Sequence, residues 1–223
     1  KANMKTVFLD IDPETLNFTA ETLEKQIKKN KLRAVIIQNT LGFPCDVEAI
    51  QKICKKHKLI LIEDLAHSVG SIYFNKKEAG LMGDFVVFSF SQDKVIDAVS
   101  GGALISKNFE ALLQKSTHQN SGASFQDKFY PFITHMVRKT YKSGFGKFLH
   151  FVFKKTKLLS NPMKSDTFKT MSDWHATLAL QELEKIDDQI EHRQKISNIY
   201  KNTIKPSNQF KGVSNIIKFS TCL

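Results

Sequence analysis

Short apolar runs that alternate with helical segments constrain the fold of this chain more than any other feature. Such runs occupy residues 34–38, 59–62, 85–90 and 103–105. Because polar residues rarely interrupt them, they are typical of strands in a parallel sheet that is covered on both faces. Strands that alternate with helices are joined by right-handed crossovers, so the pattern predicts an α/β fold with a mostly parallel central sheet flanked by helices.

The segments between the apolar runs carry helix signals. Thr19 is placed to cap a short helix that has Leu23 and Ile27 on one face. Asp46 is placed to cap a second helix, which has an apolar side and a lysine-rich side. These two signals predict one helix before and one helix after the strand at 34–38 in the sequence.

Both ends of the chain also carry patterns. A short apolar run predicts a strand over residues 6–10, and residues 172–204 are predicted to form one long helix that ends before Pro206. Glu191 and Lys195 are spaced for an ion pair on that helix. Its apolar stripe is expected to contain Leu178, Leu180, Leu183, Ile186 and Ile190.

The composition narrows the classes of function. The chain has 223 residues, of which 41% are hydrophobic, so a packed core is expected. Its formal net charge of +11 favours anionic partners. No nucleic-acid-binding signature is present, so nucleic acid is not a predicted partner, and no run of eighteen apolar residues predicts a membrane-spanning helix.

The three cysteines, Cys45, Cys54 and Cys222, lack the spacing of metal ligands. Their odd number indicates free thiols in a reducing compartment. The sequence therefore predicts a cytoplasmic protein without a metal site.

A candidate site follows from the residues at two predicted strand ends. Lys94 comes just after the apolar strand at 85–90, and the pair Gly101-Gly102 follows seven residues later. Asp64 and His67 come just after the strand at 59–62. Open α/β sheets bind ligands at strand ends, and a desolvated lysine there can form a Schiff base with a carbonyl compound. Lysine, acid and imidazole together are the protein groups that pyridoxal phosphate chemistry uses.

Several motifs occur in an order and spacing that resemble the DegT/DnrJ/EryC1/StrS family of sugar aminotransferases. The resemblance covers most of residues 6–115 and again 170–204. The motifs are Val7-Phe8-Leu9-Asp10-Ile11-Asp12-Pro13, Gly42-Phe43-Pro44-Cys45-Asp46, Ile62-Glu63-Asp64-Leu65-Ala66-His67, Gly83-Asp84, Phe88-Ser89-Phe90-Ser91-Gln92-Asp93-Lys94, Gly101-Gly102 and Met171-Ser172-Asp173.

The resemblance implies a pyridoxal-phosphate-transferase-like large domain and an incomplete small domain. Residues 1–120 would form the cofactor-binding portion, residues 121–170 an atypical basic and aromatic insertion, and residues 171–223 a long helix with the start of a C-terminal domain. Relatives are longer at both ends, so the resemblance describes a chain truncated relative to its family. Dimerisation is implied as well, because the family's active sites lie at the subunit interface.

The resemblance also implies a role for each site residue. Lys94 would bind pyridoxal 5'-phosphate covalently and then move the proton during amino transfer. Asp64 would keep the pyridine nitrogen protonated, since an opposite charge at contact favours the protonated form. His67 would lie beside the cofactor ring, and Ser89 would donate its hydroxyl to the phosphate. The implied substrates are a nucleotide-linked keto-sugar and an amino donor such as glutamate, in the biosynthesis of surface polysaccharide or related amino-sugars.

Some positions depart from the family's pattern. Ser100 replaces the glutamate that usually precedes the glycine pair, and Phe168-Lys169-Thr170 replaces a frequent Asn-Tyr-Arg. Asn39 and Leu41 replace a frequent His and Tyr. These changes affect phosphate anchoring and sugar-nucleotide binding, and they leave Lys94 and Asp64 in place.

The segment 128–164 contains no acidic residue and is rich in aromatic residues and lysines. One interpretation is a surface that binds an anionic membrane. The favoured interpretation is a helical hairpin whose aromatic residues cover the core and whose lysines face water, because Pro131, Gly144 and Gly146 interrupt a single helix.

Three functions thus compete with the aminotransferase. The first is a catalytically silent family member that acts as a partner or assembly protein, and the second is a module that binds membrane surfaces. The third is a dehydratase of the same family, which is disfavoured because those relatives usually replace the lysine that Lys94 represents.

Overall fold

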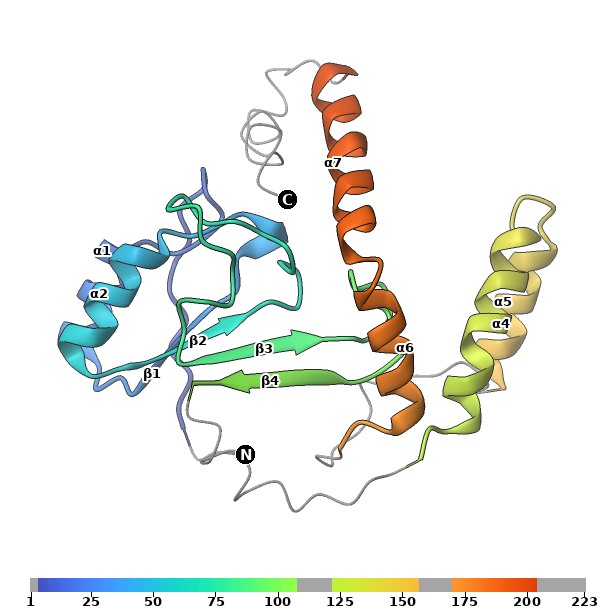
Figure 1. The fold of residues 1–223 in the computed structure, drawn as a ribbon, viewed down its shortest axis with the longest axis horizontal. Coiled ribbons are helices and arrows are strands. Elements are labelled where there is room, and N and C mark those ends of the chain that lie inside the picture. Colours follow the sequence, from blue (N-terminus) through green and yellow to red (C-terminus); the bar gives the residue numbers. More distant parts are fainter. Residues whose placement is uncertain (1–3, 108–121, 157–169, 204–223) are drawn as a thin grey trace. The chain divides into compact units, whose positions relative to one another are not determined.

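The computed structural model describes residues 4–107, 122–156 and 170–203 (Figure 1). The chain divides into two compact units, one built from residues 1–88, 104–110 and 187–223, and the other from residues 89–103 and 111–186. Phe168, Lys169, Pro206 and Cys222 lie outside the described residues. The domain boundaries at 120 and 170 stay predictions.

A four-stranded sheet with the order β1-β2-β3-β4 forms the centre of the fold (Figure 1). β1, β2 and β3 are parallel, and β4 runs in the opposite direction to β3. The predicted α/β fold with a mostly parallel sheet is therefore confirmed. The strands are β1 (Ala34–Ile37), β2 (Ile60–Asp64), β3 (Phe85–Ser89) and β4 (Gly102–Ser106).

Two capped helices belong to the first unit. α1 (Ala20–Lys29) begins after Thr19, whose hydroxyl accepts a hydrogen bond from the Thr22 amide at 3.2 Å. α2 (Val47–His57) begins after Asp46, whose carboxylate accepts one from the Ala49 amide at 3.1 Å. Both predicted N-caps are confirmed, and a short 3-10 turn, η1 (Thr40–Gly42), connects β1 to the second cap.

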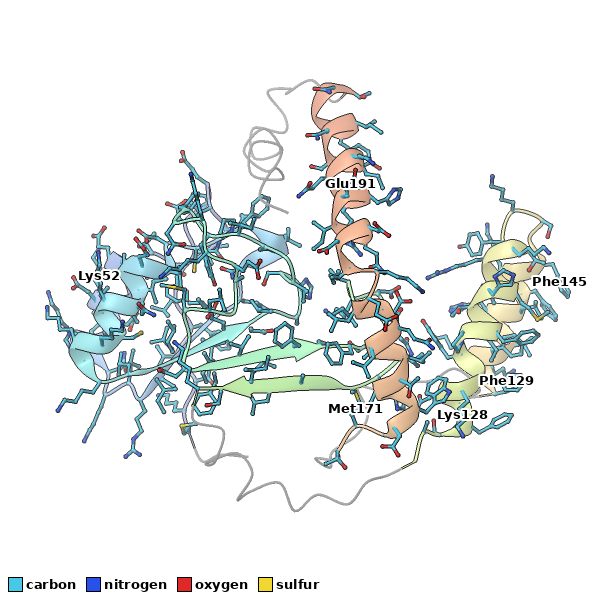
Figure 2. All side chains as sticks on the ribbon, in the orientation of Figure 1. Lys52, Lys128, Phe129, Phe145, Met171 and Glu191 are labelled. Atoms are coloured by element: carbon cyan, nitrogen blue, oxygen red, sulfur yellow. The ribbon has the colours of Figure 1, made fainter. Side chains whose placement is uncertain are left out.

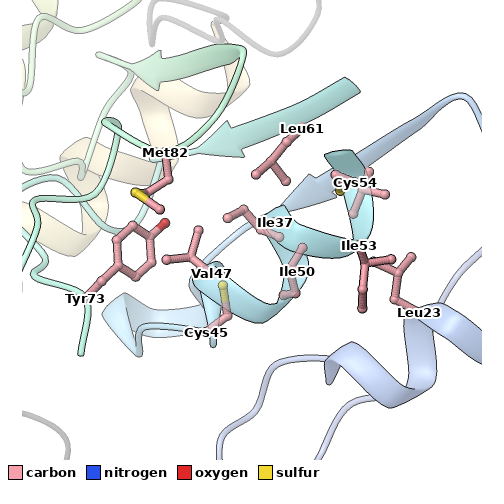
Figure 3. Close-up of a cluster of buried hydrophobic side chains, with 11 residues drawn as sticks. Leu23, Ile37, Cys45, Val47, Ile50, Ile53, Cys54, Leu61, Tyr73 and Met82 are labelled. Carbon is pink, nitrogen blue, oxygen red and sulfur yellow. The ribbon is translucent and has the colours of Figure 1, made fainter. Parts of the chain in front are cut away.

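The main core lies between one face of the sheet and these two helices (Figure 3). Val35 and Ile37 of β1 and Leu61 of β2 contribute from the sheet, in the every-second-residue pattern of a strand. The remaining core residues come from α1, α2 and the connecting loops; they are Leu23, Cys45, Val47, Ile50, Ile53, Cys54, Tyr73 and Met82.

The opposite face of the sheet carries a second row of apolar side chains. The parallel register places Ile36 beside Ile62 and Ile62 beside Phe85, so these side chains form a row across three strands. Ile36 is 60% exposed. Ile62 and Phe85 are half-buried, so within this row the exposure is greatest at the edge strand β1.

Two other predictions are wrong. Residues 6–10 form no strand, and Phe8 is 89% exposed there, because the segment gains no neighbouring strand to pair with. Residues 172–204 form two helices instead of one, α6 (Asp173–Leu183) and α7 (Ile186–Thr203). Leu180 and Leu183 of the expected stripe are exposed, whereas the Glu191–Lys195 ion pair is confirmed at 2.6 Å.

The second unit contains a helical hairpin. Its helices are α4 (Phe125–Lys139) and α5 (Phe145–Lys155), and they are separated at Gly144. The expected interruptions at Pro131 and Gly146 are wrong, because Pro131 lies inside α4 and Gly146 inside α5. The hairpin half of the favoured interpretation is nevertheless confirmed. The other half is wrong, because most of its aromatic side chains are exposed instead of covering a core. Among the described residues, no helix combines the length and apolar character that crossing a membrane requires.

Candidate active site

Asp64 is the last residue of β2, on the face of the sheet opposite the main core. It lies in register with Val87 of β3, so the carboxyl ends of the two parallel strands lie at the same edge. Its Oδ1 accepts a hydrogen bond from the Ala66 amide at 3.0 Å, which orients the half-buried carboxylate. His67 follows in the same turn and is exposed.

Glu63, the residue before Asp64, points to the opposite side of the sheet and is fully buried. Its carboxylate accepts hydrogen bonds from the Tyr73 hydroxyl and the Met82 amide, both at 2.8 Å. The Gly80 amide at 2.7 Å and the Gly83 amide complete its contacts. Glu63 thus fastens the loop 71–84 to β2 directly beside Asp64.

The same buried network reaches the departure at Asn39. The Asn39 amide group donates to the Tyr73 hydroxyl at 2.8 Å, and its Oδ1 accepts from the Cys45 amide at 3.1 Å. Burial, with the Glu63 carboxylate nearby, raises the pKa of the Cys45 thiol to about 12. Asn39 therefore has a structural role here, and the Cys45 thiol is not a nucleophile at neutral pH.

Lys94 lies in a closed loop of the second unit. The loop is joined at its base by hydrogen bonds from the Phe90 amide to the Gly101 carbonyl and from the Ala98 amide to the Phe90 carbonyl, both at 2.9 Å. The Asp97 carboxylate accepts from the Asp93 amide at 3.2 Å and from the Val99 amide at 2.9 Å. Lys94 itself is half-buried. The loop is therefore held on both sides of the lysine by one carboxylate.

Gly101 has a packing reason to be glycine. Its φ of +110° is in the left-handed region, and a Cβ atom there would collide with the Met171 side chain. The glycine of the predicted pair thus lets the Lys94 loop approach the segment that begins α6. Ser89, at the end of β3, has its hydroxyl 2.9 Å from that of Ser91, and both side chains are half-buried.

The structure brings Ser89 and Lys94 together in one unit and Asp64 and His67 together in the other. That the two pairs face one another across a bound cofactor stays a prediction. The sequence reading missed Glu63 and Asp97 as supports of the site. Glu63 had a signal, since an acid two residues after buried Leu61 on a strand must point into the core. Among the described residues, no group of three or more acidic, histidine or cysteine side chains is arranged to hold a metal ion.

The fold is a mostly parallel α/β sheet in which Asp64 ends β2 and the Lys94 loop follows β3. The chain belongs to the DegT/DnrJ/EryC1/StrS aminotransferase family, whose family model matches residues 1–215.

Individual relatives agree with this assignment. A GDP-perosamine synthase from Vibrio cholerae is 35% identical over 109 residues, which cover 49% of this chain and 29% of the relative. The UDP-4-amino-4,6-dideoxy-N-acetyl-beta-L-altrosamine transaminase of Campylobacter jejuni is 27% identical over 214 residues, covering 95% of this chain and 49% of the relative.

Solved structures share the fold. The aminotransferase TlmJ from Streptoalloteichus hindustanus superposes with a TM-score of 0.64 at 21% identity, covering 91% of this chain and 46% of that one. The chain thus spans less than half the length of each of these three proteins.

Proposed function

We propose that this chain carries the cofactor-binding part of a pyridoxal-phosphate-dependent aminotransferase that acts on a nucleotide-linked keto-sugar. The observation that carries the proposal is the ordered Lys94 loop after β3, together with Asp64 at the end of the adjacent parallel strand. Perosamine synthase and altrosamine transaminase relatives support the substrate class. An amino donor such as glutamate and a role in surface polysaccharide or related amino-sugar synthesis complete the proposal.

The residues present fit the cofactor. Lys94 offers a primary amine on a loop that backbone hydrogen bonds close at its base. Asp64 offers a carboxylate, of which Oδ1 accepts the hydrogen bond from the Ala66 amide. The paired hydroxyls of Ser89 and Ser91 suit a phosphate group. Pyridoxal phosphate, when bound, supplies an electron sink for the electrons released at the substrate carbon.

Each side chain then has a defined task. The Asp64 carboxylate holds a proton on the ring nitrogen, because the two opposite charges stabilise each other. The Lys94 amine would bind the cofactor. It would afterwards move a proton between the substrate carbon that bears the amino group and the cofactor carbon to which that group is transferred. Ser89 donates its hydroxyl hydrogen to the phosphate, and His67 bounds the ring.

We place the reaction in the cytoplasm and in a homodimer. Cys45 and Cys54 are free and buried in the described structure, which supports a reducing compartment. The family resemblance supports the dimer.

The test is direct. The purified chain is mixed with pyridoxal phosphate, the visible absorbance of the lysine-bound cofactor is recorded, and borohydride reduction is followed by peptide mapping. We expect the cofactor to be fixed at Lys94 and to be lost in Lys94→Ala. Lys77→Ala, which changes an exposed lysine in a turn, is the matched control. A chain that gains no absorbance and no fixed cofactor would end the proposal.

A catalytically silent assembly partner is the second candidate, and the replacement of the family's glutamate by Ser100 favours it. It predicts that the chain shows no amino transfer from glutamate to a nucleotide-linked keto-sugar even when the cofactor is bound. Measured transfer that depends on Lys94 would exclude it.

A further inference from the structure

The α4–α5 hairpin packs through a narrow seam. Gly146, in the first turn of α5, is buried against the Val137 carbonyl and the Tyr141 amide at the end of α4, with no room for a Cβ atom. Its own amide donates to the Thr140 carbonyl at 2.9 Å. On α4, Ile133 is buried. Tyr130 and Phe153 are half-buried as well, whereas the other described aromatic side chains of the hairpin are exposed.

Each helix presents an aromatic stripe to solvent. On α4 the stripe has the i, i+4, i+7 spacing of one helix face, and its rings touch: Phe125 and Phe129 stack at 4.8 Å between centroids, and Phe129 meets Phe132 edge-on at 5.8 Å. On α5 the stripe is Phe145, Phe148 and Phe151. The six phenylalanine side chains are 43–63% exposed. Figure 2 shows Phe129 and Phe145 on the outside of the hairpin.

Basic side chains dominate the charge of this surface, and Asp127, in the first turn of α4, is the one acidic residue of the described hairpin. From Lys128 to the end of the described hairpin at residue 156 there is no acidic residue. Seven basic side chains are exposed there, and they are Lys128, Arg138, Lys139, Lys142, Lys147, Lys154 and Lys155. Lys147 lies 5.5 Å from the centre of the Tyr141 ring, so cations and rings are interleaved.

This combination fits one kind of partner better than another. Protein interfaces are rich in aromatic residues but poor in lysine at their centre. A helix with Phe on one side and lysines beside it is typical of a segment that lies in the interface of a membrane, where apolar rings enter the acyl boundary and cations meet lipid phosphates.

We propose that the α4–α5 hairpin is a docking surface for an anionic phospholipid membrane. Its phenylalanines insert at the headgroup level, and its lysines bind the acidic headgroups. The hairpin belongs to the same unit as the Lys94 loop, since Arg138 of α4 approaches Asp93 at 3.8 Å. Docking would therefore hold that loop at the membrane. The inference depends on the hairpin alone and not on the proposed amino transfer.

The test uses flotation of the full chain with vesicles. We expect binding to phosphatidylcholine vesicles that contain about 30% phosphatidylserine, little binding to phosphatidylcholine alone, and loss of binding in high salt. Phe148→Ser/Phe151→Ser should weaken binding at least about tenfold, because two exposed rings no longer enter the lipid. The matched control is Phe74→Ser, which changes an equally exposed phenylalanine (62%) outside the hairpin.

A second pair of variants isolates the charge. Lys154→Gln/Lys155→Gln should weaken binding to the acidic vesicles, whereas Lys76→Gln/Lys77→Gln, which removes two exposed lysines from a turn of the first unit, should not. Circular dichroism must show unchanged helix content in every variant. Cofactor fixation at Lys94 should also be unchanged, which separates this test from that of the proposed function.

Three results would overturn the inference. One is equal binding by the variants and their controls. Another is binding to neutral and acidic vesicles alike without salt dependence. The third is concentration-dependent self-association that needs Phe148 and Phe151 while vesicles are not bound, which would identify the surface as a protein interface.

Discussion

At the scale of single residues, the buried acid beside the candidate site is the most costly group to disturb. Glu63→Gln keeps the shape but turns one acceptor of the carboxylate into a donor that faces N–H and O–H groups. We expect the free energy of unfolding to fall by about 2–3 kcal/mol, measured by urea denaturation. Glu48→Gln, at an exposed position of α2 that bonds Asn75, should change it by less than about 0.5 kcal/mol. Equal stability of Glu63→Gln and the native chain would contradict the network.

A second residue-scale prediction concerns Asp97, which we regard as a positioning residue for Lys94. Asp97→Ala removes the acceptor of the Asp93 and Val99 amides, so the loop loses its support on both sides. We expect cofactor binding at Lys94 to weaken about tenfold, with little change in the urea midpoint.

Asp93→Asn is the control for Asp97→Ala. It keeps a residue that tolerates the left-handed φ of +65° at position 93 and removes only an exposed ion pair with Arg138. The affinity of both variants for pyridoxal phosphate is measured by absorbance titration. Equal affinities of Asp97→Ala and Asp93→Asn would show that Asp97 does not position the lysine.

At this scale the sequence indicates candidates for chemistry but not the residues that support them. Lys94, Asp64, His67 and Ser89 could be selected because they follow apolar strands in a recognisable motif. Asp97 could not, because its role depends on a loop that closes on itself, and no short pattern encodes the bonds to residues 93 and 99. Asn39 could be recognised as a departure, but its bond to Tyr73, 34 positions away, exists only in the fold.

At the scale of elements, α4 and α6 are joined by a buried polar contact. Ser172 caps α6, and its hydroxyl lies 2.7 Å from Nδ1 of His175. Nε2 of His175 lies 3.5 Å from the Asp127 carboxylate in the first turn of α4, and Trp174 packs edge-on against the imidazole. The sequence predicted the start of α6 at Ser172 but gave no indication of this link.

This link makes stability depend on pH. Burial lowers the pKa of His175 below its ordinary 6.5, although Asp127 opposes the shift. His175 therefore binds a proton more readily in the unfolded chain than in the folded chain. The stability that the neutral imidazole contributes is present above pH 6.5 and is lost as the pH falls below that value. We expect the urea midpoint to fall between neutral and mildly acidic pH.

Variants assign that dependence. His175→Gln should flatten the pH profile of the urea midpoint below 6.5, whereas His192→Gln, at an exposed position of α7, should leave it unchanged. An unaltered profile in His175→Gln would show that other groups carry the pH dependence.

Helix and strand boundaries show which elements a sequence can specify. The caps at Thr19 and Asp46 are local interactions between neighbours, and both were predicted. The strand at 6–10 needed a partner strand, and the single helix at 172–204 needed continuous packing on one side. Neither condition is local, and both predictions were wrong.

At the scale of the whole molecule, the sheet face opposite the main core is a candidate surface for association. Its central row, Ile36, Ile62 and Phe85, is apolar, and it leads to Asp64 at the strand ends. Ile36, at the edge of this row, is 60% exposed, and an exposed apolar side chain that adjoins further apolar surface favours association with another surface.

We therefore expect the chain to self-associate as its concentration rises, and this association to depend on Ile36. Ile36→Glu adds a charge at a side chain that is 60% exposed, so the free energy of unfolding should change by less than about 1 kcal/mol while the weight-average mass in sedimentation equilibrium falls toward that of a monomer. Val35→Glu, one residue earlier, places the same charge in the core and should unfold the unit instead. The two variants separate a role in association from a role in folding, because neighbouring side chains of β1 point to opposite faces of the sheet. A native chain that stays monomeric at all concentrations, or an Ile36→Glu chain that associates as the native one does, would show that this face contacts water in the free protein.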